Sequence, residues 1–195
     1  MFDLGVRDTR PDTRDAALVP APRTRDQERI EGVTHPDDEL ALTKAGRADV
    51  ETVRALLEEV SAWLLGKGLR QWPERFDDEW FVPALHAGET WLASRRGALV
   101  ATITLQWEDE VVWGPRPPDA GYVHRLAVRR AAAGVGADLL TWAEQETRAR
   151  GRSFLRLDCW SENTRLREYY ETHGFEHRGD TAEWGWTVSR YEKRV

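Results

Sequence analysis

The sequence is poor in residues that would indicate a disulfide framework, a zinc site or a membrane anchor. Cys159 is the only cysteine of 195 residues, so no intramolecular disulfide can form, and the Cys-x-x-Cys pairs of zinc sites are missing. No apolar run is long enough to span a bilayer, and the first 15 residues contain no signal-peptide core. We therefore expect a cytoplasmic protein without a metal site or a membrane partner.

An excess of positive charge is also lacking. With 28 Lys and Arg against 34 Asp and Glu, the formal net charge is −6, which argues against a nucleic-acid partner. The length suits one domain with a full core. Residues 1–36 are charged, carry four prolines and show no periodic apolar face, so they are expected to be a flexible arm. Residues 37–195 are expected to be the folded domain.

Apolar periodicity and turn residues predict an α/β fold with a mixed sheet, helices on both faces and the element order β α α β β β α β α β β. Strands are expected at 39–44, 89–95, 98–107, 121–128 and 153–159, with two more between 175 and 190 joined near 181–182. Helices are expected at about 49–64, 77–86, 136–151 and 163–172. The proline-rich run 107–120 is expected to be a loop.

The most informative stretch is Gly121–Gly136, GYVHRLAVRRAAAGVG, which predicts a strand, a glycine turn and the start of a helix. Such a turn directs backbone N–H groups toward one point at the positive end of the helix dipole, which suits a phosphate. It is not a P-loop, and it lacks the third glycine of a dinucleotide fingerprint. The alternative is an ordinary tight connection between a strand and a helix.

A second segment, Asn163–Phe175, reads NTRLREYYETHGF. Together with the L-x-V strand end Leu126–Val128 and the glycine turn, it resembles the GCN5-related N-acetyltransferase superfamily, whose members carry an N-x-x-(A/L)-x-x-(F/L/Y)-Y-x-x-x-G-F segment. The resemblance covers residues from about Glu39 to the C-terminus.

The resemblance implies acetyl-CoA as the acyl donor. The pantetheine arm would pair with Leu126, Ala127 and Val128, and the pyrophosphate would lie on the amides of Ala133, Gly134, Val135, Gly136 and Ala137. Asn163 would bond pantetheine; an N-cap role is its alternative. One position departs from the family pattern, because Ala131 stands where the family has Arg or Gln. Arg129 or Arg130 are then the nearby sources of positive charge.

The resemblance also implies catalytic residues. Tyr170 aligns with the tyrosine that protonates or hydrogen-bonds the leaving thiolate; its alternative is a buried aromatic of an amphipathic helix. His124 is the candidate base, and strand alternation places it on the same face as Tyr122 and Leu126. A structural histidine is the alternative. The loop acids Glu108, Asp109 and Glu110 are the other candidate bases, whereas Asp158 and Cys159 end the following strand near the site.

These observations predict transfer of an acetyl group to a primary amine of a small molecule, by direct attack in a ternary complex. The alternative is a coenzyme-A-binding sensor or interaction domain without activity. A homodimer is compatible with the family. Of the ten tryptophans, Trp63 and Trp91 are expected in the core, and Trp72, Trp107 and Trp113 are candidates for a pocket wall.

Overall fold

The structure is a computed structural model that describes residues 39–132, 134–183 and 185–195. The predicted arm, residues 1–36, lies outside the described residues, and so does Ala133. No helix within the described ranges is both long and apolar enough to cross a membrane.

The described residues form a seven-stranded sheet in the order β1-β2-β3-β4-β5-β7-β6. Only the β4–β5 pair is parallel, so the predicted mixed sheet is confirmed. The strands are β1 (Ala41–Lys44), β2 (Thr90–Arg95), β3 (Ala98–Gln106), β4 (Ala120–Val128), β5 (Phe154–Trp160), β6 (Glu176–Glu183) and β7 (Trp186–Arg194).

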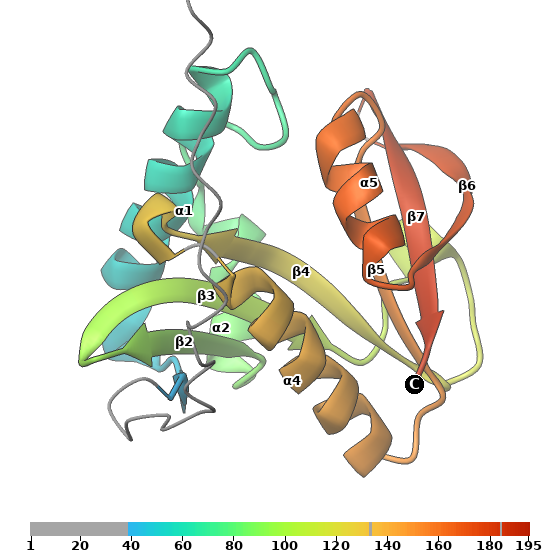
Figure 1. Ribbon diagram of the computed structural model, residues 1–195, viewed down its shortest axis with the longest axis horizontal. Helices are drawn as coiled ribbons and strands as arrows, with labels where there is room; N and C mark the ends of the chain where they lie inside the picture. Colours follow the sequence, from blue (N-terminus) through green and yellow to red (C-terminus); the bar gives the residue numbers. More distant parts are fainter. Residues whose placement is uncertain (1–38, 133, 184) are drawn as a thin grey trace, which may run out of the picture. The chain divides into compact units, whose positions relative to one another are not determined.

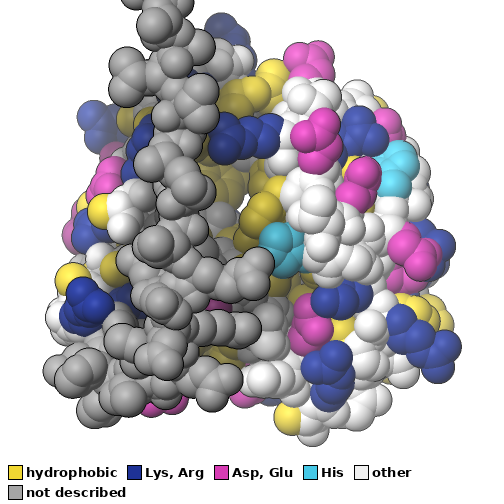
Figure 2. Space-filling view, in the orientation of Figure 1, with side chains coloured by type: hydrophobic (Ala, Val, Ile, Leu, Met, Phe, Trp, Pro, Cys, Tyr) yellow, Lys and Arg dark blue, Asp and Glu magenta, His cyan; other side chains and the backbone are white. Residues whose placement is uncertain are grey.

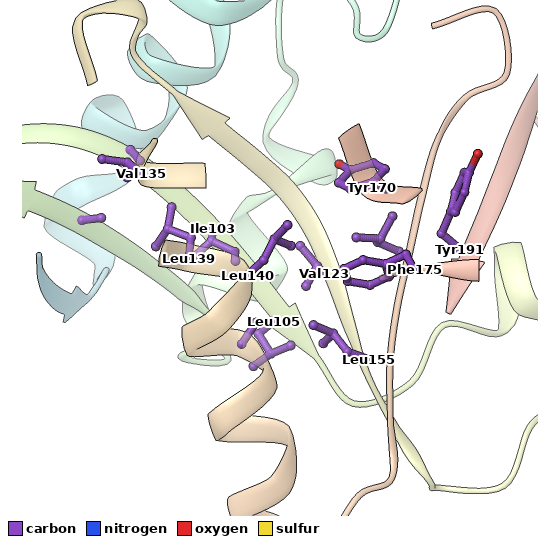
Figure 3. Close-up of a cluster of buried hydrophobic side chains, with 14 of the residues drawn as sticks. Ile103, Leu105, Val123, Val135, Leu139, Leu140, Leu155, Tyr170, Phe175 and Tyr191 are labelled. Atoms are coloured by element: carbon purple, nitrogen blue, oxygen red, sulfur yellow. The ribbon is translucent and has the colours of Figure 1, made fainter. Parts of the chain in front are cut away.

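Helices cover both faces of this sheet, as predicted (Figure 1). Residues of α4 (Val135–Ala149) pack on one face in a core that also includes Tyr170 of α5 (Thr164–Thr172) and Phe175, which follows this helix. Figure 3 shows this cluster. Residues of α1 (Val50–Leu65) and α2 (Val82–His86) form a second core with Ala127 of β4. Short 3₁₀ turns lie at Arg47–Asp49, Asp78–Trp80 and Arg130–Ala132.

Two local predictions are wrong. The run 107–120 contains a one-turn helix, α3 (Glu110–Trp113), because the Asp109 carboxylate caps it by accepting a hydrogen bond from the Val112 N–H at 3.1 Å. The last hairpin does not turn at 181–182: β6 runs through both residues to Glu183, and Gly185, with φ +85°, lies in the connection.

The strands β4 and β5 pair over only part of their length. Ala120–Val123 lie opposite Phe154–Leu157, but β4 continues to Val128 and β5 to Trp160 without further pairing between them. Figure 1 shows the two strands diverging beyond this point. The divergence opens a gap in the middle of the sheet, flanked by two strand edges.

A β-bulge in β4 lies at the start of this gap. Thr102 pairs with Ala127 while Thr104 pairs with His124, so β4 has one extra residue, and Arg125 adopts φ +48°. The extra residue breaks the alternation, and the prediction that His124, Tyr122 and Leu126 share a face is wrong. Leu126 packs against the α4 core, whereas Tyr122 belongs to the cluster around Trp113.

The close approach of α4 to β4 requires a glycine at position 121. A Cβ added there would lie 2.5 Å from Thr147 Oγ1 and 3.2 Å from Leu105 Cδ1. We expect Gly121→Ala to lower the free energy of unfolding by about 1–3 kcal/mol, because overpacking forces the helix from the sheet. Urea denaturation measures this change.

The control is Gly46→Ala, where the nearest atom to an added Cβ is Asp49 Oδ2 at 3.9 Å. The double variant Gly121→Ala/Thr147→Ala should recover part of the loss relative to Thr147→Ala alone. Equal unfolding midpoints for Gly121→Ala and the wild type would contradict this account of the packing.

Candidate functional site

Titratable side chains from three elements meet where β4 and β5 diverge. His124 comes from β4, Asp158 from β5 and Asp109 from the cap of α3, and their ligand atoms all lie within 4.8 Å of one another. Carboxylate and imidazole atoms at such distances can share a small cation. The sequence analysis identified these residues separately, and the structure brings them together.

His124 is held as a neutral imidazole. Its Nε2 lies 3.7 Å from Asp109 Oδ2, beyond hydrogen-bond distance. Burial, and then the positive charge of Arg125, lower the pKa of His124 to about 3. A group with so low a pKa is a weak proton acceptor at neutral pH. The assignment of His124 as the base stays a prediction, with this observation against it.

Asp158 has the opposite shift. Burial, and then the nearby Asp109 carboxylate, raise the pKa of Asp158 to about 7, while the Arg125 guanidinium lowers it. Burial also lowers the pKa of Arg125 to about 10, and its Nε is buried without a hydrogen-bond partner among the described residues. Asp158 therefore titrates in the range in which a general base works best.

Of the three loop acids, Glu108 and Glu110 are exposed and Asp109 is half-buried. The hydrogen bond from the Val112 N–H fixes the Asp109 carboxylate at the start of α3. Asp109 is thus the loop carboxylate that belongs to the site.

Tyr170 reaches the gap from the α5 side. Its ring is buried against Phe175 and Tyr191, with centroids 5.9 Å away in both cases, and its hydroxyl points toward β4 (Figure 3). Burial, and then the negative charges that Cys159 and Asp158 can carry, raise the pKa of Tyr170 well above its usual value. The phenol therefore stays protonated and can donate a hydrogen bond. Tyr170 belongs to the α4 core, and its role in catalysis stays a prediction.

Cys159 lies beside these groups and is inert. The side chain is fully buried, and burial, followed by the charge of Asp158, raises the pKa of its thiol to about 12. A thiol in this state is a poor nucleophile.

Asn163 caps α5, because its Oδ1 accepts a hydrogen bond from the Leu166 N–H at 3.2 Å. Its Nδ2 donates to Gln71 Oε1, which also accepts the Trp160 N–H at 3.3 Å. Gln71 was not identified from the sequence, since it lies in an irregular stretch without a motif. Its amide carbonyl shows that this edge of the gap can bind an amide.

The glycine turn leads into α4 as predicted. Gly134, with φ +96°, is the N-cap, and the helix begins at Val135. The N–H of Ala137 donates to the Gly134 carbonyl at 3.0 Å. Pyrophosphate binding by the amides of this turn stays a prediction. A Cβ on Gly136 would lie 3.0 Å from the Tyr169 hydroxyl, so this glycine lets α5 approach α4.

The two candidate cations near this turn already have contacts. Arg129 donates to Glu59 at 3.0 Å and to the Leu99 carbonyl at 2.9 Å. Arg130 stacks over Trp63 at 4.9 Å, and Trp63 is 37% exposed, so its prediction as a core residue is wrong. Ala131 is exposed between them and the turn.

The other predicted aromatic residues differ in their surroundings. Trp107 lines a cavity of about 470 Å³ with Trp91 and Trp142. Trp113 and Tyr122 form a buried cluster, in which the Tyr122 hydroxyl accepts a hydrogen bond from Arg156 at 2.8 Å and is thus engaged. On the face that Figure 2 shows, hydrophobic groups lie in a hollow, and side chains of both charge signs lie near it.

Comparison with known proteins agrees with this geometry. The family model "Acetyltransferase (GNAT) family" matches residues 54–175. The N-acetyltransferase YesJ of Bacillus subtilis (strain 168), described as uncharacterized, is 30% identical over an alignment of 145 residues, and the match covers 69% of this chain and 80% of that protein.

Solved structures have the same fold. A GNAT-family acetyltransferase from Listeria monocytogenes 4b F2365 is 25% identical with a TM-score of 0.67, covering 80% of this chain and 95% of the other. The acetyltransferase yncA from Salmonella typhimurium, solved with its cofactor acetyl-CoA, is 14% identical with a TM-score of 0.58, covering 80% and 94%. On the matches to the family model and to YesJ, this chain belongs to the acetyltransferase (GNAT) family.

Proposed function

We propose that this acetyltransferase moves an acetyl group from acetyl-CoA to a primary amine of a small-molecule acceptor, by direct attack in a ternary complex. One observation carries the proposal: β4 and β5 diverge after Val123 and Leu157, and two carboxylates meet there, close enough to Tyr170 for the charge of Asp158 to raise the pKa of the phenol. A thioester in this gap would have a hydrogen-bond donor and a proton acceptor at hand.

The donor would lie along the unpaired edge of β4. An extended pantetheine arm can take the place of a strand beside Leu126, Ala127 and Val128. Its pyrophosphate would lie on the glycine turn, where the first amides of α4 favour an anion. Asn163 and the Trp160 N–H would then bond a pantetheine amide at the position that the Gln71 carbonyl occupies.

The reaction needs a neutral amine, which attacks the thioester carbonyl carbon, after which the C–S bond breaks. Tyr170 would act on the sulfur. Because its pKa is raised above the usual value of about 10, higher than the roughly 8.5 of an ordinary thiol, donation of a hydrogen bond to the thiolate is favoured over outright loss of the proton. This stabilises the leaving group in the transition state.

A coenzyme-A-binding domain without activity is the second candidate. Position 131 is alanine and offers no basic or amide side chain, and Arg129 is paired with Glu59. This departure from the family pattern favours a domain that binds coenzyme A without transferring an acetyl group. The two candidates differ in whether an amine consumes the thioester.

The first experiment separates these candidates. We expect acetyl-CoA in excess to raise the melting temperature, since a ligand at 100 times its Kd stabilises by about 2.7 kcal/mol. We also expect release of free thiol that depends on one or more members of an amine panel. Stabilisation without amine-dependent thiol release would identify the binding domain, and the lack of both would contradict either function.

The second experiment concerns Tyr170. We expect Tyr170→Phe to lower kcat by about 10²-fold, the usual contribution of a positioned proton donor, with the Kd for acetyl-CoA nearly unchanged. Steady-state kinetics and calorimetric titration measure the two quantities.

Tyr169→Phe is the matched control, because its hydroxyl lies at Gly136 beside the glycine turn and not in the gap. This variant should keep kcat, and any effect should fall on the Kd. If Tyr170→Phe keeps the wild-type kcat, Tyr170 has no part in the mechanism.

A further inference from the structure

We infer that Gln71 holds the place of the acyl donor in the ligand-free protein, and that acetyl-CoA displaces its carboxamide when it binds. The inference rests on the proposed acetyltransferase function, because it takes the gap between β4 and β5 as the site of the donor. It adds a side chain of the protein itself that competes for this site and thereby sets the affinity for the donor.

The Trp160 N–H is a hydrogen-bond donor on the edge of β5 that faces the gap. The N–H of Ser161, the next residue, donates to the Thr187 carbonyl of β7 at 3.0 Å. Successive N–H groups along an extended chain point to opposite edges. The Trp160 N–H is therefore directed away from β7, toward the edge where β5 no longer pairs with β4.

Gln71 supplies the acceptor at this edge. Its Oε1 accepts the Trp160 N–H at 3.3 Å and Asn163 Nδ2 at 3.2 Å, so both lone pairs of this oxygen are used. Gln71 comes from the irregular connection after α1, far from β5 and α5 in the sequence. A residue of the α1 layer thus reaches the edge of the gap.

The chemistry of this contact is that of an amide ligand. Pantetheine carries two secondary amides, and each presents a planar carbonyl oxygen like that of a glutamine side chain. The one hydrogen of the Trp160 N–H cannot serve Gln71 and a pantetheine carbonyl at the same time. If the arm uses this donor, Gln71 has to leave it, so the contact competes with the donor and does not support it.

The segment that carries Gln71 is fixed on both sides of this residue. The Leu69 N–H donates to the Leu64 carbonyl at 3.0 Å, and the Pro73 carbonyl accepts from Ser61 Oγ at 2.6 Å. Leu64 and Ser61 both belong to α1. Within the described residues, the Gln71 side chain makes only its two hydrogen bonds. A change of its rotamer can therefore release both donors while the segment stays on α1.

The competition is expected to be weak. Both hydrogen bonds lie at or beyond the long end of the usual range for N–H···O contacts, and ordering a glutamine side chain costs rotamer entropy. The net effect should be that of about one ordinary hydrogen bond, which is roughly 3- to 10-fold in affinity. Gln71 thus lowers the affinity for the donor without preventing its binding.

The test measures the Kd of acetyl-CoA by calorimetric titration in full-length variants. Gln71→Ala removes the carboxamide, so the Kd should fall about 3- to 10-fold. Gln71→Glu keeps the acceptor and adds a negative charge, which strengthens hydrogen bonds from both donors, so the Kd should rise. Gln145→Ala, which removes an exposed glutamine of α4, is the matched control and should keep the wild-type Kd.

Two fragments of the donor locate the effect. S-Acetylpantetheine keeps the arm with its amides, whereas adenosine 3′,5′-bisphosphate lacks the arm. Each Gln71 variant should change the Kd of the first fragment by the same factor as that of acetyl-CoA and leave the Kd of the second unchanged. Repulsion between the new carboxylate of Gln71→Glu and phosphate groups would instead act on the bisphosphate.

A variant of Asn163 tests the second hydrogen bond. Asn163→Ser keeps a capping oxygen for α5 and removes the amide donor. In this background the gain from Gln71→Ala should be smaller, because one of the two donors that Gln71 occupies is gone.

Hydrogen exchange of the Trp160 amide gives a readout that does not depend on affinity. The exchange should be faster in ligand-free Gln71→Ala than in the ligand-free wild type, because the amide has lost its acceptor. Saturating acetyl-CoA should restore the protection in this variant, since a pantetheine carbonyl then takes the place of the glutamine oxygen.

The inference is overturned if Gln71→Ala binds acetyl-CoA with the wild-type Kd or more weakly, because Gln71 would then be neutral or a support of the site. An equal gain for adenosine 3′,5′-bisphosphate would also overturn it, because the effect would not lie at the pantetheine arm. Both results leave acetyl transfer itself intact. A wild type that neither binds acetyl-CoA nor releases thiol would refute the proposed function and this inference together.

Discussion

The site depends on one constraint, the end of the parallel pairing between β4 and β5. Four residue pairs hold the strands together, and after Val123 and Leu157 each strand continues without the other. Backbone N–H and C=O groups at such an edge need partners, and Gln71 supplies one for the Trp160 N–H. An edge that the chain leaves in the interior of a sheet is a template for an extended ligand. In the proposed function, this edge is where the acyl donor would bind.

The bulge in β4 turns the side chains beyond it toward the cores in which they pack. Arg125, in the left-handed region, adds one residue opposite β3 and reverses the alternation beyond it. Leu126 then packs on the α4 side, while Ala127 joins the core of α1 and α2. Without the extra residue, each of these side chains would face the wrong layer. The same residue places its guanidinium beside Asp109 and Asp158.

Much of the fold could be predicted because long strands and helices carry their own periodicity, and the segment Asn163–Phe175 carries a family pattern. The features that were missed lack such a signal. The bulge centres on an arginine and not on a glycine, and α3 is four residues long. The last turn is an exception: Gly185 is a turn signal in the sequence, but the prediction placed the turn at 181–182. The candidate site residues were named one by one from the sequence, but their mutual distances and the burial of Asp158 are tertiary properties that no local pattern contains.

Burial raises the pKa of two acids of this candidate site, but it leaves them in different protonation states near neutral pH. It raises the pKa of Tyr170 from an already high value, so the phenol stays protonated and can only donate. It raises the pKa of Asp158 from about 4 to about 7, so the carboxyl can both take and release a proton near neutrality. The ordinary pKa of each side chain decides which protonation state results at neutral pH, because the shared apolar surroundings raise both pKa values. A mixed sheet that opens between two helical layers provides these surroundings, since the gap is lined by strands whose other residues belong to the cores.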